Sequence, residues 1–138
     1  MLPNPYGLAI TLDNAKKATA PAIAEARKNN WAMAVAVVDT AGDLVYFEKM
    51  DATQTGSVAV SIAKARSAAL FKRPTKVFQD TLAAGGDGLR ILRLENAVPV
   101  EGGVPLVMDG KIVGAIGLSG GTSHQDGQCA QAGASALQ

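Results

Sequence analysis

The pattern of hydrophobic and polar positions in the first part of the chain predicts a helix followed by a hairpin. Apolar residues recur at spacings of three and four from Leu12 to Asn30, which predicts a helix that Pro21 should kink or restart. The run Met33–Asp39 is short, rich in valine and apolar at almost every position, as in a central strand covered on both faces. The loop Thr40–Asp43 should connect it to a second strand, Leu44–Lys49, so the two strands are expected to pair.

Helix signals return after this hairpin. Small apolar residues predict a helix over Gly56–Lys72, and Arg73-Pro74 should end it because the residue before a proline avoids the helical region. Thr75 can cap a second, short helix at about Lys76–Ala84. The cluster Gly85–Gly88 should stop that helix, since glycine readily adopts the positive φ found after a helix end.

The last third of the chain predicts a second hairpin and a final helix. Leu89–Leu94 fits either a strand or a helical turn, and Ala97–Val100 fits a short strand. Two apolar runs then flank Asp109-Gly110, a dipeptide suited to a two-residue type I′ turn. Ser123, followed three residues later by a carboxylate, has the capping-box pattern and should open a helix that runs to Leu137.

Glycine pairs lie at both ends of the second hairpin. Because its two strands are antiparallel, Gly102-Gly103 and Gly120-Gly121 should meet at one edge of the sheet. Glycines there leave backbone N–H groups bare, which makes room for a ligand or for another backbone. They also serve tight turns, and the sequence does not decide between these uses.

The order of elements predicts an α/β (α+β) fold in one domain spanning residues 1–138, with residues 1–10 as an extended arm. Strands joined by hairpins give a mainly antiparallel sheet, and an apolar central strand needs helices on both faces. We therefore expect a three-layer α/β/α sandwich.

Composition narrows the classes of function. The chain has 138 residues, 13 basic and 12 acidic, which gives a net charge of +1 and makes nucleic acid or a membrane surface unexpected partners. With one cysteine, Cys129, and one histidine, the chain cannot form an internal disulfide or supply a usual zinc site alone. The N-terminus has no signal-peptide pattern and no apolar run approaches the roughly 20 residues that span a bilayer. A cytoplasmic location is expected.

Three ionisable residues near the glycine pairs are candidate catalytic groups. His124 in the first turn of the last helix is a candidate haem axial ligand or general acid/base, or a solvated helix-start residue. Asp126 fits a cap partner, or a base or ligand anchor facing the glycines. Glu101 precedes the first glycine pair, where it can act as a general base or form a salt bridge.

Further candidates would bind a ligand rather than react with it. Lys64 and Arg66 lie on different faces of a helix rich in alanine, so either can hold an anionic group such as a carboxylate or a haem propionate, or both can be solvated. Ser67 lies near Lys64 on that helix. The complete predicted binding set is Lys64, Arg66, Ser67, Gly102, Gly103, Val104, Gly120 and Gly121. Cys129, on the apolar face of the last helix, fits a buried small hydrophobe better than a reactive thiol.

Several segments together resemble the GlcG/HbpS family, also called the haem-degrading domain family, which includes the C-terminal domain of PduO-type proteins. The segments are Val37–Gly42, Lys49–Asp51, Ala63–Thr75, Gly102–Val107, Gly110–Gly120 and Gln125–Ala130. The resemblance implies a profilin-like fold with a five-stranded antiparallel sheet and homo-oligomers, often octamers. It also implies haem binding in some members, with haem breakdown or redox sensing attached, while other members have no settled activity.

One departure from this family bears on haem. Histidines tied to haem ligation in relatives lie outside the matching segments, and this chain has no histidine before position 124. A haem ligand here would be His124, Cys129, a methionine, tyrosine or hydroxyl group, or a residue of a neighbouring subunit. We therefore expect a homo-oligomeric protein that binds haem or another small molecule. The alternatives are an enzyme of small-molecule catabolism acting on an acidic or carbonyl metabolite and an accessory subunit without a ligand.

Overall fold

The structure, a computed structural model, describes residues 3–138. Its elements, in chain order, are α1 (Leu12–Lys28), β1 (Ala34–Asp39), β2 (Leu44–Lys49), α2 (Ser57–Phe71), α3 (Thr75–Ala83), the 3-10 helix η1 (Gly86–Arg93), β3 (Gly103–Met108), β4 (Lys111–Ser119) and α4 (Ser123–Ser135). Apart from a strand at Ala97–Val100, the helices and strands predicted from hydrophobic spacing are present, and the predicted bounds of β2 agree residue for residue.

The strands form one antiparallel sheet in the order β2-β1-β4-β3. The central pair is β1 and β4, in which Val37 lies opposite Ile116. The turn between β3 and β4 has φ of 52° at Asp109 and 73° at Gly110, so the predicted turn with two positive φ angles is confirmed. This hairpin places the start of β3 beside the end of β4, since Gly103 pairs with Gly117.

Within residues 3–138 the sheet has four strands, so the expectation of five is wrong. Ala97–Val100 is not a strand, because Pro99 has no N–H to donate and the N–H of Val98 donates to the Ser67 hydroxyl at 3.0 Å. In the described part of the N-terminal arm, from residue 3 onward, one isolated parallel bridge forms, between Tyr6 and Ile112. Neither segment therefore extends the sheet by a full strand.

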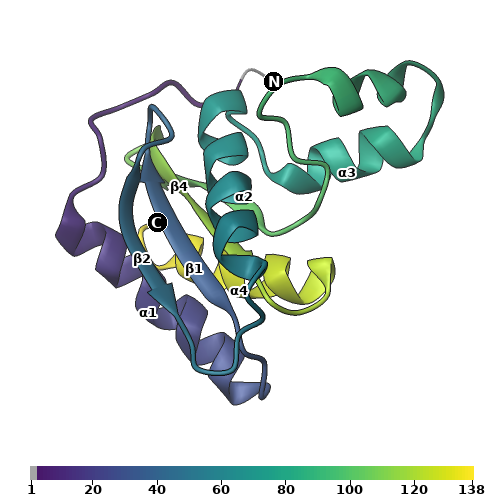
Figure 1. The fold of residues 1–138 in the computed structure, drawn as a ribbon. Helices are drawn as coiled ribbons and strands as arrows, with labels where there is room; N and C mark the ends of the chain where they lie inside the picture. Colours follow the sequence, from purple (N-terminus) through teal and green to yellow (C-terminus); the bar gives the residue numbers. More distant parts are fainter. Residues whose placement is uncertain (1–2) are drawn as a thin grey trace.

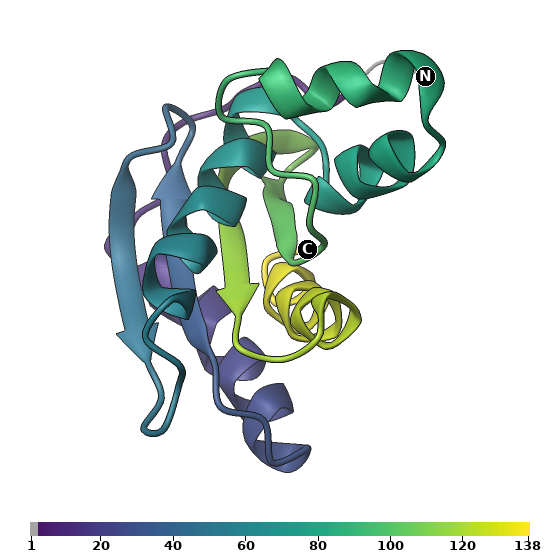
Figure 2. The same cartoon turned by 45° about the vertical axis from the view of Figure 1, so that its right-hand side comes forward.

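Helices cover both faces of the sheet (Figure 1). On one face, α1 and α4 pack on Val35, Val37 and Ile116. On the other face, alanines of α2 pack on Ala36 and Val38. Figure 2 shows α3 and η1 lying together at one corner, where α3 reaches the sheet near β3.

Local differences from the expected helices have simple causes. Helix α1 continues through Pro21 as one element, so no second helix starts there. Gly85 and Gly86 both have positive φ and end α3 as predicted. Leu89–Leu94, which fitted a strand or a helical turn, falls mostly within η1. Within the part of the chain that the structure describes, no helix combines the length and apolar character needed to cross a membrane.

Candidate functional site

The first turn of α4 begins one residue earlier than the sequence pattern indicated. The cap is Thr122, whose hydroxyl accepts the Gln125 N–H at 3.2 Å, while the Gln125 side chain accepts the Thr122 N–H at 3.0 Å. The predicted capping box of Ser123 and Asp126 is therefore wrong by one position. This shift matters because it leaves the Asp126 carboxylate available for a different partner.

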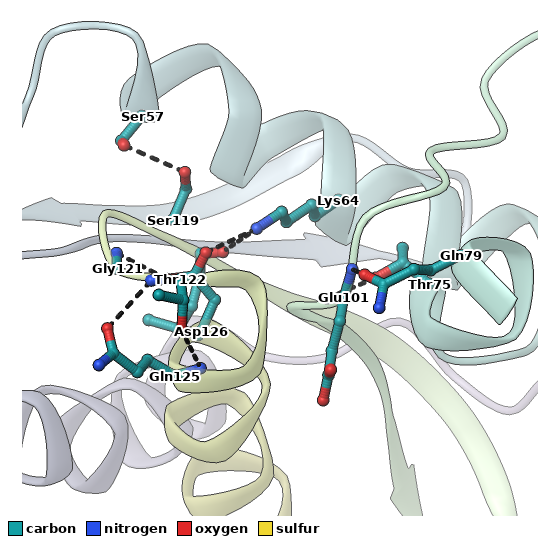
Figure 3. A network of polar contacts seen from close by, with 12 residues as sticks. Ser57, Lys64, Thr75, Gln79, Glu101, Ser119, Gly121, Thr122, Gln125 and Asp126 are labelled. Carbon is teal, nitrogen blue, oxygen red and sulfur yellow. Dashed lines mark hydrogen bonds and ion pairs between the residues drawn. The ribbon is translucent and has the colours of Figure 1, made fainter. Parts of the chain in front are cut away.

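That partner is Lys64, and the two form a buried ion pair (Figure 3). The Lys64 ammonium donates to Asp126 Oδ2 at 2.8 Å, and the two side chains are only 1% and 3% exposed. Burial raises the pKa of the Asp126 carboxyl, while the hydrogen bond and charge of Lys64 act in the opposite direction. Since both charges are paired and sealed from solvent, neither side chain lines the surface groove described below.

Two further hydrogen bonds extend this pair. Lys64 also donates to the Leu118 carbonyl at 3.0 Å, and the other oxygen of Asp126 accepts the Gly121 N–H at 3.0 Å. The pair thus links α2, the end of β4 and the first turn of α4. Figure 3 shows Lys64 and Gly121 both directed towards Asp126.

The glycine pairs make room for packed backbone rather than leaving bare donors. The N–H of Gly103 donates to the Thr75 hydroxyl at 2.9 Å, and that of Gly121 is taken by Asp126. A Cβ at Gly103 would collide with the Lys64 carbonyl, and one at Gly120 with the Ala32 carbonyl. The two pairs do lie close together, since the Leu118 N–H donates to the Gly102 carbonyl at 2.9 Å. The N–H groups of Gly103 and Gly121 are thus not bare, contrary to our expectation, whereas the expected close approach of another backbone segment to the glycines is confirmed.

A groove of about 650 Å³ lies beside Glu101 and His124, and none of the four glycines of these pairs is among its lining residues. Parts of α1, the start of α3, the approach to β3 and the exposed face of α4 form it. Its lining residues are Glu25, Pro74, Lys76, Glu101, Val104, His124, Gly127, Gln128, Gln131, Ala132 and Ser135. Three residues of the predicted site, Glu101, Val104 and His124, are among them.

Charged side chains stand at the rim of the groove. The Glu101 backbone N–H donates to Gln79 Oε1 at 2.8 Å, and its carboxylate lies so close to Gly127 that a Cβ there would collide with it. Lys76 pairs with Asp80 at 2.7 Å, and the hydrogen bond and charge of that carboxylate raise the pKa of Lys76. Both carboxylate and ammonium groups are therefore within reach of a ligand in the groove.

His124 is the imidazole of this groove and the only histidine of the chain. Its side chain is exposed, and its ring makes no hydrogen bond with another residue of the described range 3–138. A cluster of three potential metal-ligating side chains is also absent from that range. The groove can therefore supply one imidazole ligand to a metal ion but not a complete set of protein ligands.

The remaining predicted residues lie elsewhere. Arg66 donates to the Gly42 carbonyl at 3.1 Å and lies beside the turn between β1 and β2. Ser67 is buried, and its hydroxyl accepts the Val98 N–H. Neither residue lines the groove, and ligand contacts by Arg66 and Ser67 stay predictions.

Sequence reasoning missed most of the groove wall. The α4 contribution, Gly127, Gln128, Gln131 and Ser135, repeats at helical spacing and was a detectable signal. Glu25 and Lys76 carried no such signal, because they join the groove only through packing of α1 and α3 against the rest of the molecule.

The fold and groove define a class: an antiparallel α+β sheet protein with one imidazole in a partly apolar surface groove. Comparison with known proteins gives the family. The family model described as "Haem degrading protein HbpS-like" matches residues 10–135. The chain belongs to this HbpS-like family.

Individual relatives agree with this assignment. Protein GlcG of Escherichia coli is 42% identical over 95 residues, which are 69% of this chain and 69% of that protein. The crystal structure of Klebsiella pneumoniae ORFY has a TM-score of 0.86 at 29% identity and covers 99% of this chain and 96% of its own. A solved PduOC:Heme complex has a TM-score of 0.84 at 26% identity and covers 95% of this chain and 96% of its own.

Proposed function

We propose that this protein binds haem in the groove between α1, α3, β3 and α4, with His124 as the protein ligand to the iron. The observation that carries the proposal is that the single imidazole of the chain lines this groove. Its family membership supports a haem-related role, and the haem-bound PduOC structure shares its fold.

The residues of the groove fit the chemistry of haem. The wall is partly apolar, since Pro74, Val104 and Ala132 line it, and these side chains suit contact with the faces of a porphyrin. His124 supplies a nitrogen ligand of the kind that haem iron takes in many proteins. Lys76 supplies a cation for a propionate, although it also pairs with Asp80. When bound, haem would contribute redox-active iron, and a haem-degrading or redox-sensing role is proposed on that basis.

Absorbance titration with hemin tests this proposal. Wild-type protein should give a saturable shift of the Soret band at one haem per chain. The variant His124→Ala should lose the shifted band and weaken binding at least tenfold, by about 1.4 kcal/mol or more. Asp43→Asn, which changes an exposed side chain beside the turn between β1 and β2 that does not line the groove, should behave as wild type. If wild type gives no spectral change, the proposal that the protein binds haem is wrong. If His124→Ala keeps the same Soret band as wild type, His124 is not the iron ligand.

A second candidate is an enzyme acting on a small acidic or carbonyl metabolite. It is favoured by the presence of Glu101 and His124 in the same groove, where a carboxylate and an imidazole can move protons. Lys76 would hold the anionic group of the substrate in place of Lys64 or Arg66. Turnover of such a metabolite that Glu101→Gln abolishes, with no response to hemin, would favour this candidate over haem binding.

We also propose that the protein is a homo-oligomer, on the basis of its exposed apolar side chains. Large apolar side chains are exposed along η1 and just after it, with Leu89 55% and Leu92 64% accessible. Side chains of this kind are commonly covered in assemblies. A neighbouring subunit packed near this corner would also lie close to the α3 side of the groove.

A further inference from the structure

The Lys64–Asp126 ion pair adjoins residues that line the groove, both on α4 and at the approach to β3. On α4, Asp126 comes directly before Gly127 and two residues after His124, and both of these line the groove. Lys64 packs against Gly102, which follows the groove residue Glu101. Movement of the pair would therefore be transmitted directly to the groove wall.

The pair fixes α4 to two other elements. Asp126 receives hydrogen bonds from the Lys64 ammonium at 2.8 Å and from the Gly121 N–H at 3.0 Å, and Lys64 also donates to the Leu118 carbonyl. Hydrogen bonds to charged groups are directional and stronger than neutral ones. The first turn of α4 is thereby held at a set position relative to both α2 and β4.

Stability alone does not account for two buried charges. Replacing a buried ion pair with apolar side chains of similar volume is often neutral or stabilising, because both charges lose their hydration in the folded state. Nor does α4 need Asp126 to begin, since Thr122 and Gln125 already cap it. What an apolar replacement would not reproduce is the directional link between α4, α2 and the end of β4.

We infer that the Lys64–Asp126 pair positions the first turn of α4 and so sets where the His124 ring lies in the groove. This inference rests on the proposed function, in which a ligand binds through His124. Asp126 and Lys64 are then positioning residues that act through His124 and make no contact with the ligand.

Gly102 is the third part of this arrangement. It has φ of 136°, and a Cβ there would lie 2.7 Å from the Lys64 ammonium and 3.0 Å from Asp126 Cβ. The same Cβ would lie 2.8 Å from the Leu118 carbonyl that accepts from Lys64, so a side chain here would push on the pair and on its backbone acceptor. Gly102→Ala should therefore disturb the groove in the same way as a change at Asp126, although it removes no charge.

Proton NMR of the single histidine provides a test that does not require haem. The NOE cross-peaks of the His124 ring report which groups it touches in the folded protein. We compare wild type with Asp126→Asn and with the apolar double variant Lys64→Met/Asp126→Leu. Asp43→Asn is the matched control, because Asp43 is 76% exposed and its only ion pair, to Arg66, is at 4.0 Å within the described residues. Folding of each protein is checked by circular dichroism and thermal melting.

The expected result is a changed set of His124 cross-peaks in Asp126→Asn and in the double variant, with the control unchanged. Hemin affinity should fall at least tenfold in both variants, while the melting temperature of the double variant stays close to that of wild type. Unchanged cross-peaks and affinity in a folded double variant would overturn the inference. Failure of both variants to fold would also overturn it, because the pair would then be required for folding itself. If wild type binds no haem, the proposed function fails, yet the cross-peaks still decide the inference.

Discussion

At the scale of single residues, burial determines the chemistry that each ionisable side chain can perform. Cys129 is completely buried, and desolvation, with smaller contributions from the charges of Glu25 and Asp126, raises the pKa of its thiol to about 12. The thiolate is the nucleophile and the metal ligand, so a thiol that stays protonated is inert. Cys129 therefore acts as a small apolar member of the core rather than as a reactive group of the groove.

Cys129 should therefore show a distinctive dependence of stability on pH. Its ordinary pKa of 9.0 applies in the unfolded chain, and the folded value is about 12, so the folded state binds the thiol proton more tightly. The contribution of the protonated thiol to stability is fully present below pH 9 and is lost as the pH rises towards 12. Urea unfolding of wild type and Cys129→Ala, measured between pH 8 and 11, checks this.

The difference between these two proteins isolates the thiol, because tyrosines and lysines titrate equally in both. At pH 8 the alanine variant should be less stable by about 1 kcal/mol, since it leaves a small cavity. That advantage of wild type should shrink steadily at higher pH. A difference that stays constant up to pH 11, or rapid alkylation of the folded wild type at pH 8, would contradict the assigned environment.

At the scale of elements, small residues allow α2 to lie directly on β4. A Cβ at Gly117 would collide with the Ser61 carbonyl and would lie 2.5 Å from the Ala65 nitrogen, both in the helix backbone. Backbone cannot move aside as a flexible side chain can. The close contact also explains why α2 is rich in alanine and serine. It brings Lys64 of α2 near enough to the sheet to reach Asp126 of α4.

Gly117→Ala should consequently be among the most damaging single substitutions in the chain. We expect a loss of about 3 kcal/mol or more in the free energy of unfolding, or failure to fold. Gly56→Ala is the matched control, because Gly56 has φ of −62° and no atom within 4 Å of its ideal Cβ. That variant should lie within about 0.5 kcal/mol of wild type. Similar unfolding curves for both variants would contradict the packing described for α2.

Local patterns predicted most elements and failed where tertiary contacts compete. The Asp109-Gly110 turn and the β2 strand followed from backbone preference and alternation alone. The N-cap of α4 was predicted one residue too late, because Thr122 and Ser123 carry equivalent hydroxyls. Which of them caps the helix depends on where the loop between β4 and α4 ends. Ala97–Val100 was expected to be a strand, but Ser67 on a distant helix takes the Val98 N–H that pairing would have used.

At the scale of the whole molecule, the candidate site combines parts that sequence spacing cannot relate. Glu101, Val104 and His124 were predicted together because a hairpin brings the start of β3 near the loop after β4. Glu25 and Lys76 reach the same groove through the packing of α1 on α4 and of α3 beside β3. The burial of Lys64 was also beyond prediction, since a lysine on a helix is ordinarily solvated unless a distant carboxylate pairs with it.

Assembly is a property of the whole molecule that light scattering can measure. We predict a mass that is a multiple of the monomer mass, in which a neighbouring subunit covers the exposed leucines Leu89 and Leu92 of η1. The variant Leu92→Lys should lower that mass, whereas Leu44→Lys, which changes a leucine of similar exposure (50%) on β2, serves as the control. A monomer over a wide concentration range would contradict the prediction.

The central claim, that haem binds through His124 in the groove, is tested most directly by the proton NMR signal of that single histidine during titration with ferric haem. Coordination to the paramagnetic iron should remove the Hε1 resonance from the diamagnetic region in proportion to the haem added. Metal-free protoporphyrin, which has the same ring and propionates, should leave the resonance in that region. A Soret shift that reaches saturation while the His124 resonance stays in place would contradict the claim.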